Sequence, residues 1–320
     1  MPAYVESLFY QREGGVPWHS LGTQVDKALT GQEALELSGA DYSVETGPLF
    51  TRINDGFRPV PGVSIYRKDT GEILGKSGRV YQPYQNTDMI DWFEPLIDSG
   101  LAKYETGGVL HGGQCCWFLC KLNSDNSEIV KDDEIQKYLL LSNWHDGLKS
   151  IRCGFTPIRV VCANTEAFAT EGREAHMIRV RHTSQTKIVL DEVRESINLA
   201  NQQFEMTAEK YRWLANRVCN KKALEKFAKI IVVGDENKPD DEISTRSKNI
   251  MDEIVTLATR GQGNDLPGVR GTWWAAYNGV SEWLNYKRGH NEDSRLNSIW
   301  FGTNYLTNQK ALSTALTLAG

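Results

Sequence analysis

Apolar residues recur at every third or fourth position over residues 186–218, and this spacing keeps them on one side of a helix. At 1.5 Å per residue, a single helix over this range would be roughly 50 Å long. That is too long for an ordinary surface helix, so we expect this helix to pack along a sheet, along a partner subunit, or along both. The apolar stripe consists of Val189, Val193, Ile197, Ala200, Phe204, Ala208, Tyr211, Ala215 and Val218.

Runs of apolar and β-branched residues before this helix predict β-hairpins. The central hairpin joins residues 138–144 to residues 151–162 through the His-Asp-Gly turn at 145–147. Asp-Gly between two such runs is a strong local signal for a hairpin. We also expect hairpins at residues 63–75 and 101–122 and a strand at residues 176–181.

Other segments have the pattern of capped or amphipathic helices. Thr30 is followed by Glu33 three positions later, which is the pattern of a capping box, and Gly39 would end that helix. The chain is therefore expected to be α+β, with antiparallel β-hairpins packed on the long helix and a helical C-terminal region. Further helices are predicted at residues 88–97, 164–170, 244–260, 272–286 and 298–318. The expected parts are an N-terminal α+β region (1–100), a β-hairpin and long-helix core (101–233) and a helical C-terminal region (242–320), with a linker near 234–241.

Composition places the chain among ordinary globular proteins, since 40% of its 320 residues are hydrophobic and 24% are charged. No run of about 18 apolar residues predicts a membrane span, and the first residues do not have the pattern of a secretion signal. The six cysteines form no Cys-x-x-Cys pair, which indicates reduced thiols and a cytoplasmic protein. The net charge of −5 argues against general nucleic-acid coating, but basic residues are concentrated in residues 149–187 and 209–229.

The sequence contains no strong catalytic or metal-binding motif, and we expect neither a cofactor nor an enzymatic activity. The segment at residues 71–77 resembles a phosphate-binding loop, but it has one residue too few between its glycines. His176 and His182 lack a third metal ligand at a suitable spacing. His145 beside Asp146 suggests catalysis, but the geometry of a tight turn is enough to explain the Asp and Gly there.

Cationic and aromatic residues alternate around the central hairpin and the entry to the long helix. Proteins usually bind single-stranded nucleic acid with cationic side chains along the phosphates and with aromatic rings that stack on the bases. The alternative is that the aromatic residues belong to the core and that the arginines pair with carboxylates. The candidate nucleic-acid-binding residues are Lys149, Arg152, Arg159, Arg179, Arg181, Lys187, Trp144 and Phe155.

Short motifs in order over nearly the whole chain match those of a known family. They are Trp18-His19-x-Leu21-Gly22, Asp69-Thr70-Gly71-Glu72-x-Leu74-Gly75, Tyr81-Gln82-Pro83-x-Gln85-Asn86, Thr156-Pro157-x-Arg159-Val160-Val161-Cys162-x-Asn164-Thr165, Arg181-His182-Thr183 and Gly271-Thr272-x-Trp274-x-Ala276-Tyr277-Asn278. The chain resembles a family of phage- and plasmid-encoded proteins catalogued as a domain of unknown function. This resemblance implies a cytosolic protein of a mobile element and implies no activity.

The order of basic hairpins and a long helix also resembles the annealing superfamily that includes Redβ, RecT and Erf. That resemblance implies a phage-type single-stranded DNA-binding and annealing protein that acts as a homo-oligomer in ATP-independent recombination. One alternative is a phage accessory protein that binds host or virion proteins through the aromatic helix at 272–286. Another is an enzyme whose site the sequence does not reveal.

Overall fold

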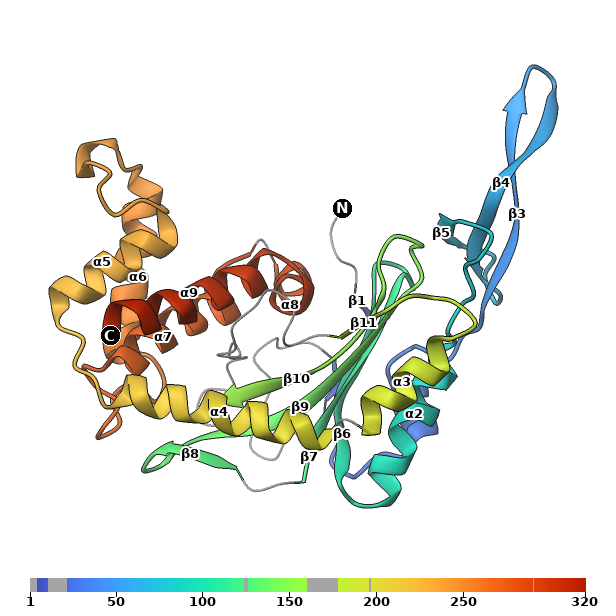
Figure 1. The fold of residues 1–320 in the computed structure, drawn as a ribbon. Helices are drawn as coiled ribbons and strands as arrows, with labels where there is room; N and C mark the ends of the chain where they lie inside the picture. The colour runs from blue at the N-terminus through green and yellow to red at the C-terminus, as the bar shows by residue number, and fades with distance from the viewer. Residues whose placement is uncertain (1–4, 11–21, 124–125, 160–177, 196, 290) are drawn as a thin grey trace.

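A central sheet organises the protein in the computed structural model, which describes residues 5–10, 22–123, 126–159, 178–195, 197–289 and 291–320 (Figure 1). Its eight described strands have the order β11-β10-β9-β7-β6-β1-β2, with β8 paired to β9. The pairings are antiparallel except for the parallel β1–β2 pair. The strands are β1 (Val5–Tyr10), β2 (Thr23–Gln24), β6 (Ala102–Leu110), β7 (Cys115–Leu122), β8 (Ser127–Val130), β9 (Asp133–Trp144), β10 (Ile151–Arg159) and β11 (Ile178–Val180).

The expected α+β class and the predicted hairpins are confirmed. β6 pairs with β7, and β9 pairs with β10 across the turn that contains the His-Asp-Gly sequence. Because strand side chains alternate between the two faces of a sheet, Cys153 lies on one face and Arg152 on the other. Arg152 is opposite Ser142 of β9, so both point away from the face that carries Cys153.

Three helices cover the Cys153 face of the sheet: α1 (Gly31–Leu37), α2 (Asn86–Asp98) and α3 (Thr186–Glu195). Figure 1 shows α2 and α3 side by side next to the sheet. The predicted capping box is present, with Thr30 accepting from the backbone of Glu33 and Glu33 accepting from that of Thr30. Trp92 of α2 donates its indole N–H to the carbonyl of Leu190 in α3 at 2.8 Å. The two helices are thereby joined to each other as well as to the sheet.

A second sheet forms a ribbon that projects from the body (Figure 1). It consists of β3 (Val44–Ile53), β4 (Gly56–Arg67) and β5 (Ile73–Ser77), in the order β3-β4-β5. The β4–β5 part confirms the predicted hairpin at 63–75, whereas β3 was not predicted from the sequence pattern. All side chains from residue 50 to residue 59 are exposed, so the outer part of the ribbon buries no side chain against the other described residues.

The C-terminal region is helical, as expected, and has its own core. In the predicted helix at 272–286, Trp273, Trp274 and Tyr277 are 4%, 0% and 0% exposed. These rings pack inside the core, so they do not form the docking surface that one alternative function required. The helices are α4 (Ile197–Ala215), α5 (Lys221–Val232), the 3₁₀ turn Asp240–Glu242, α6 (Thr245–Arg260), α7 (Trp273–Glu282) with the π-helical turn Trp283–Lys287, α8 (Glu292–Phe301) and α9 (Thr303–Ala319).

Two other helix predictions have different outcomes. The structure describes α3 and α4 within residues 186–218, so a single continuous helix over that range is not confirmed. The helix predicted at 298–318 is divided at Gly302 into α8 and α9. The helix predicted at 164–170 lies outside the described residues.

No helix in the described part of the chain combines the length and apolar character needed to cross a bilayer.

Candidate nucleic-acid interface

Two arginines are directly opposite each other at the edge of the sheet. The β10–β11 register pairs Arg152 with Arg179. Arg152 is half-buried, and burial together with the nearby charge of Arg179 lowers its guanidinium pKa. Like charges opposite each other on adjacent strands are destabilising. Neither arginine forms an ion pair with a carboxylate in the part of the chain that the structure describes, and Asp146 acts on Arg152 only through its more distant charge.

Aromatic rings from β9, α8 and α9 surround this arginine pair. The Arg152 guanidinium carbon is 5.7 Å from the centroid of the Phe301 ring. Phe301 meets Trp144 edge to face at 5.3 Å between ring centroids, and the Lys149 ammonium is 3.4 Å from the centroid of Trp144. Burial raises the pKa of the Tyr305 hydroxyl, while the charges of Arg152 and Arg179 lower it. Here we name as the cationic–aromatic face Lys149, Arg152, Arg179, Trp144, Phe301 and Tyr305.

Three other candidate residues lie outside this face. Arg181 is exposed, two positions after Arg179, and it lines a separate pocket with Lys149. Lys187 is on α3, the helix that covers the opposite face of the sheet. Phe155 also points to that opposite side, where it packs against two hydrophobic cores.

Arg159 is a structural residue, which corrects its assignment to phosphate binding. It is 0% exposed, and its Nε donates to Oδ1 of Asp133 at 2.7 Å. Its terminal nitrogens donate to Asp133 Oδ2 at 2.8 Å and to Asn264 Oδ1 at 3.1 Å. Trp274 donates to the same carboxylate at 2.8 Å. Arg159 therefore joins the sheet to the C-terminal helices, and its side chain is not accessible to a DNA strand.

Trp144 also requires a correction. It is 1% exposed, and its ring is covered by Lys149, Phe301 and His111. A ring in this position does not stack on a base. It positions Lys149 instead, because the ammonium lies over the electron-rich face of the indole.

Behind the turn, buried polar side chains form a network that the sequence analysis did not identify. The Nε2 atom of His182 donates to Oδ1 of Asn143 at 2.8 Å, and that of His145 donates to Oδ1 of Asn86 at 3.0 Å. Asn143 donates in turn to the carbonyl of Tyr84 at 2.6 Å. Burial lowers the pKa of His145 to about 3 and that of His182 to about 4, so both rings are neutral at physiological pH.

The residues of the His-Asp-Gly sequence have structural roles in this turn. Oδ1 of Asp146 accepts hydrogen bonds from the backbone N–H groups of Leu148 and Lys149, at 2.8 and 2.9 Å. Gly147 has a φ of +74°, a conformation that glycine adopts readily. The signal in the sequence was Asn143, a polar residue in the apolar end of β9. A buried polar side chain in such a strand requires hydrogen-bond partners.

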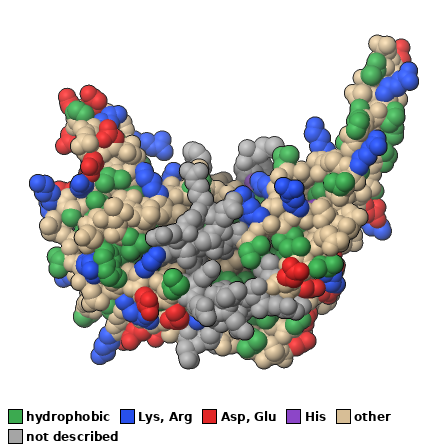
Figure 2. Space-filling model, in the orientation of Figure 1, with side chains coloured by type: hydrophobic (Ala, Val, Ile, Leu, Met, Phe, Trp, Pro, Cys, Tyr) green, Lys and Arg blue, Asp and Glu red, His purple; other side chains and the backbone are tan. Residues whose placement is uncertain are grey.

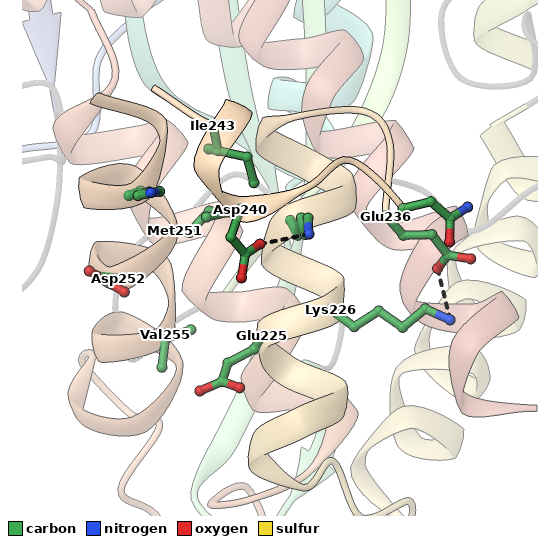
Figure 3. Close-up of a pocket in the computed structure, with 11 residues that line it drawn as sticks. Glu225, Lys226, Glu236, Asp240, Ile243, Met251, Asp252 and Val255 are labelled. Carbon is green, nitrogen blue, oxygen red and sulfur yellow. Dashed lines mark hydrogen bonds and ion pairs between the residues drawn. The ribbon is translucent and has the colours of Figure 1, made fainter. Parts of the chain in front are cut away.

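A larger pocket lies elsewhere, between α5 and α6 (Figure 3), with a volume of about 650 Å³. Four of its charged side chains form two ion pairs. Lys226 is 2.8 Å from Glu236, and Lys229 is 2.9 Å from Asp240. No residue of the cationic–aromatic face lines this pocket. Figure 2 shows acidic side chains at the end of the α5–α6 pair and several Lys and Arg side chains between that end and the ribbon.

Comparisons with known proteins identify the family. No curated protein and no solved structure matches the chain, and the resemblance to the annealing superfamily is not confirmed. The family model described as "Domain of unknown function (DUF932)" matches residues 73–300, which include the whole of β9, β10, β11 and the turn between β9 and β10. This confirms the resemblance to a family of unknown function, and the chain belongs to the DUF932 family.

Proposed function

We propose that the protein binds single-stranded DNA and anneals complementary strands, acting as a homo-oligomer without covalent chemistry. The observation that carries the proposal is the pair of adjacent arginines, Arg152 and Arg179, with no carboxylate partner among the described residues. Annealing and assembly into oligomers rest only on the resemblance of the predicted order of elements to that of the annealing superfamily, and they are tested separately below.

The energetics of the arginine pair favour an anionic ligand. Like charges directly opposite each other on adjacent strands repel each other, and this repulsion is destabilising. A phosphate that contacts both guanidiniums replaces this repulsion with charge-assisted hydrogen bonds. The folded protein should therefore have a lower free energy with a phosphate bound between Arg152 and Arg179 than without one.

The neighbouring rings favour a single strand over a duplex. Phe301 and Tyr305 are both half-buried beside the arginines, so part of each ring is accessible. Bases are available for stacking only when they are unpaired, and each stacked base contributes about 1–3 kcal/mol. Strand selectivity would therefore come from these rings, while the arginines supply affinity.

The test is a titration of labelled single-stranded and duplex DNA at several salt concentrations, with the double variant Arg152→Ala/Arg179→Ala. For single strands, each phosphate contact contributes about 0.7 to the slope of log affinity against log salt. The double variant should lower that slope by roughly 1.4 and weaken binding. The matched control is Arg246→Ala/Arg270→Ala, which removes two exposed arginines far along the chain and should leave both quantities unchanged.

Two outcomes would contradict the proposal. If the wild-type protein fails to bind single strands at low salt, DNA binding is wrong. If both double variants lower the slope equally, the binding is not located at the β10–β11 edge. Native mass measurements with and without DNA, and a fluorescence assay of strand annealing, test the oligomer and the annealing activity.

A second candidate function is an accessory protein that binds other proteins. The buried α7 helix does not favour it, but the ribbon does, because Phe50, Ile53 and Phe57 are 54%, 53% and 74% exposed near its end. This second function would be favoured if the wild-type protein does not bind DNA and if a protein that binds the wild type does not bind the Phe57→Ser variant.

A further inference from the structure

A second pocket, of about 400 Å³, lies beside the turn between β9 and β10. Three segments line it: the end of β5 with the residues after it, the 147–150 loop, and residues 181–183 before α3. None of the lining residues belongs to the α5–α6 pocket. Lys149 lines this pocket and also belongs to the cationic–aromatic face, so the two sites adjoin.

Close backbone contacts hold the walls of this pocket in place. A Cβ atom at Gly75 would lie 2.2 Å from the carbonyl oxygen of Asp146, and one at Gly147 would lie 2.2 Å from that of Lys76. The N–H of Gln82 donates to the carbonyl of His182 at 3.2 Å. The lining segments are therefore fixed relative to one another.

The polar side of the pocket fits a phosphate. Arg181 is exposed and has no carboxylate partner within the described ranges. The Lys149 ammonium is 3.5 Å from Asp146 and is positioned over Trp144. Ser150 and Thr183 add hydroxyl groups to the lining. Two cations and hydroxyl donors on facing segments are the groups that bind a phosphate ester.

The pocket also contains features that inorganic phosphate would leave unused. Val80 and Leu148 line it and are 78% and 86% exposed. The buried hydroxyl of Tyr81, another lining residue, has no hydrogen-bond partner in the described part of the chain. The apolar pair fits the flat face of a base.

We propose that this pocket binds a nucleoside monophosphate unit, with the phosphate at Lys149 and Arg181 and the base against Val80 and Leu148. The unit is either the 5′-phosphorylated end of a bound strand or a free nucleotide. For a strand end, the inference rests on the proposed function, and the remaining nucleotides would continue from Lys149 onto the cationic–aromatic face. For a free nucleotide it stands independently.

The first experiment compares single-stranded oligonucleotides of one sequence that carry a 5′-phosphate, a 3′-phosphate or no terminal phosphate. The wild-type protein should bind the 5′-phosphorylated strand about tenfold more tightly than the other two, since a charge-assisted contact is worth about 1.5–3 kcal/mol. In Arg181→Ala this preference should fall below about twofold. The control variant Arg246→Ala should keep it.

The second experiment uses thymidine monophosphate and inorganic phosphate as separate probes in calorimetric titrations. Thymidine monophosphate should bind at least about tenfold more tightly than inorganic phosphate, and Leu148→Ser should reduce that ratio. Melting temperatures of all variants confirm that they are folded. Equal affinity for the two probes would overturn the base contact.

The outcomes separate this inference from the proposed function. If strands bind without a terminal preference and thymidine monophosphate fails to bind at millimolar concentration, the pocket proposal is wrong and DNA binding remains. If strands fail to bind while thymidine monophosphate binds to wild type and not to Arg181→Ala, the proposed function is wrong. The pocket is then a site for free nucleotides.

Discussion

Replacing Arg159 with alanine should destabilise the protein far more than replacing any exposed arginine. The substitution removes both hydrogen bonds to Asp133, at 2.7 and 2.8 Å, and leaves that carboxylate 0% exposed without its cation. Trp274 would remain as a donor to it. Removing one partner of a buried ion pair typically costs about 3–5 kcal/mol, because the remaining charge stays desolvated.

The contacts of Arg159 place the expected cost in this range. The carbonyl of Gly263 accepts from Arg159 at 2.9 Å, and Oδ1 of Asn264 accepts at 3.1 Å. Both acceptors would lose this donor, which adds roughly 1 kcal/mol for each if no water enters. The indole of Trp274 offsets part of the loss by stabilising Asp133. We therefore expect a decrease of about 4 kcal/mol in the free energy of unfolding.

The assay is urea denaturation followed by circular dichroism and by tryptophan fluorescence, with Arg179→Ala as the matched control. Arg179 is exposed and has no carboxylate partner in the described part of the chain, so its loss should not lower stability by more than about 0.5 kcal/mol. Relief of its repulsion with Arg152 acts in the stabilising direction. The combined variant Arg159→Met/Asp133→Leu should recover part of the loss, because no charge then remains buried. If Arg159→Ala costs less than about 1 kcal/mol, our interpretation of this ion pair is wrong.

Two further predictions concern the turn and the network behind it. Gly75→Ala should lower the free energy of unfolding by about 1–3 kcal/mol in urea denaturation, because its Cβ would lie 2.2 Å from a backbone oxygen. Gly78→Ala is the control, since a Cβ at Gly78 would have open space around it. Equal effects of the two substitutions would refute this prediction. Stability should also fall as the pH decreases from about 6.5 to about 4, because burial lowers the pKa of His182 from 6.5 to about 4, and the unfolded chain binds the proton first. The loss is on the order of 3 kcal/mol for His182, and a His182→Gln variant that loses as much stability over this range would contradict the assignment.

Local patterns in the sequence predicted much of the fold because their causes are local. The capping box at Thr30 and the Ser244 cap of α6 depend on residues three positions apart, so they are visible without the structure. β3 was missed because Gly47 and Pro48 interrupt its pattern. The structure accommodates them where the β3–β4 register shifts after Pro48, and proline is tolerated at such irregular positions.

The candidate site was harder to predict because its residues are distant along the chain. Arg159 and Arg179 are equivalent in sequence terms, and only the positions of Asp133 and Asn264 separate the buried arginine from the exposed one. Phe301 was missed for the same reason. It belongs to α8, and no local pattern places that helix beside Arg152 of β10.

The ribbon has a consequence for how the chain can be shortened. Two strands without a third neighbour are only marginally stable in water, and residues 50–59 bury no side chain. Replacing residues 51–58 with a two-residue reverse turn should therefore leave the melting temperature of the protein nearly unchanged. It would also remove amide protons that we expect to exchange readily and an exposed site for proteolytic nicking.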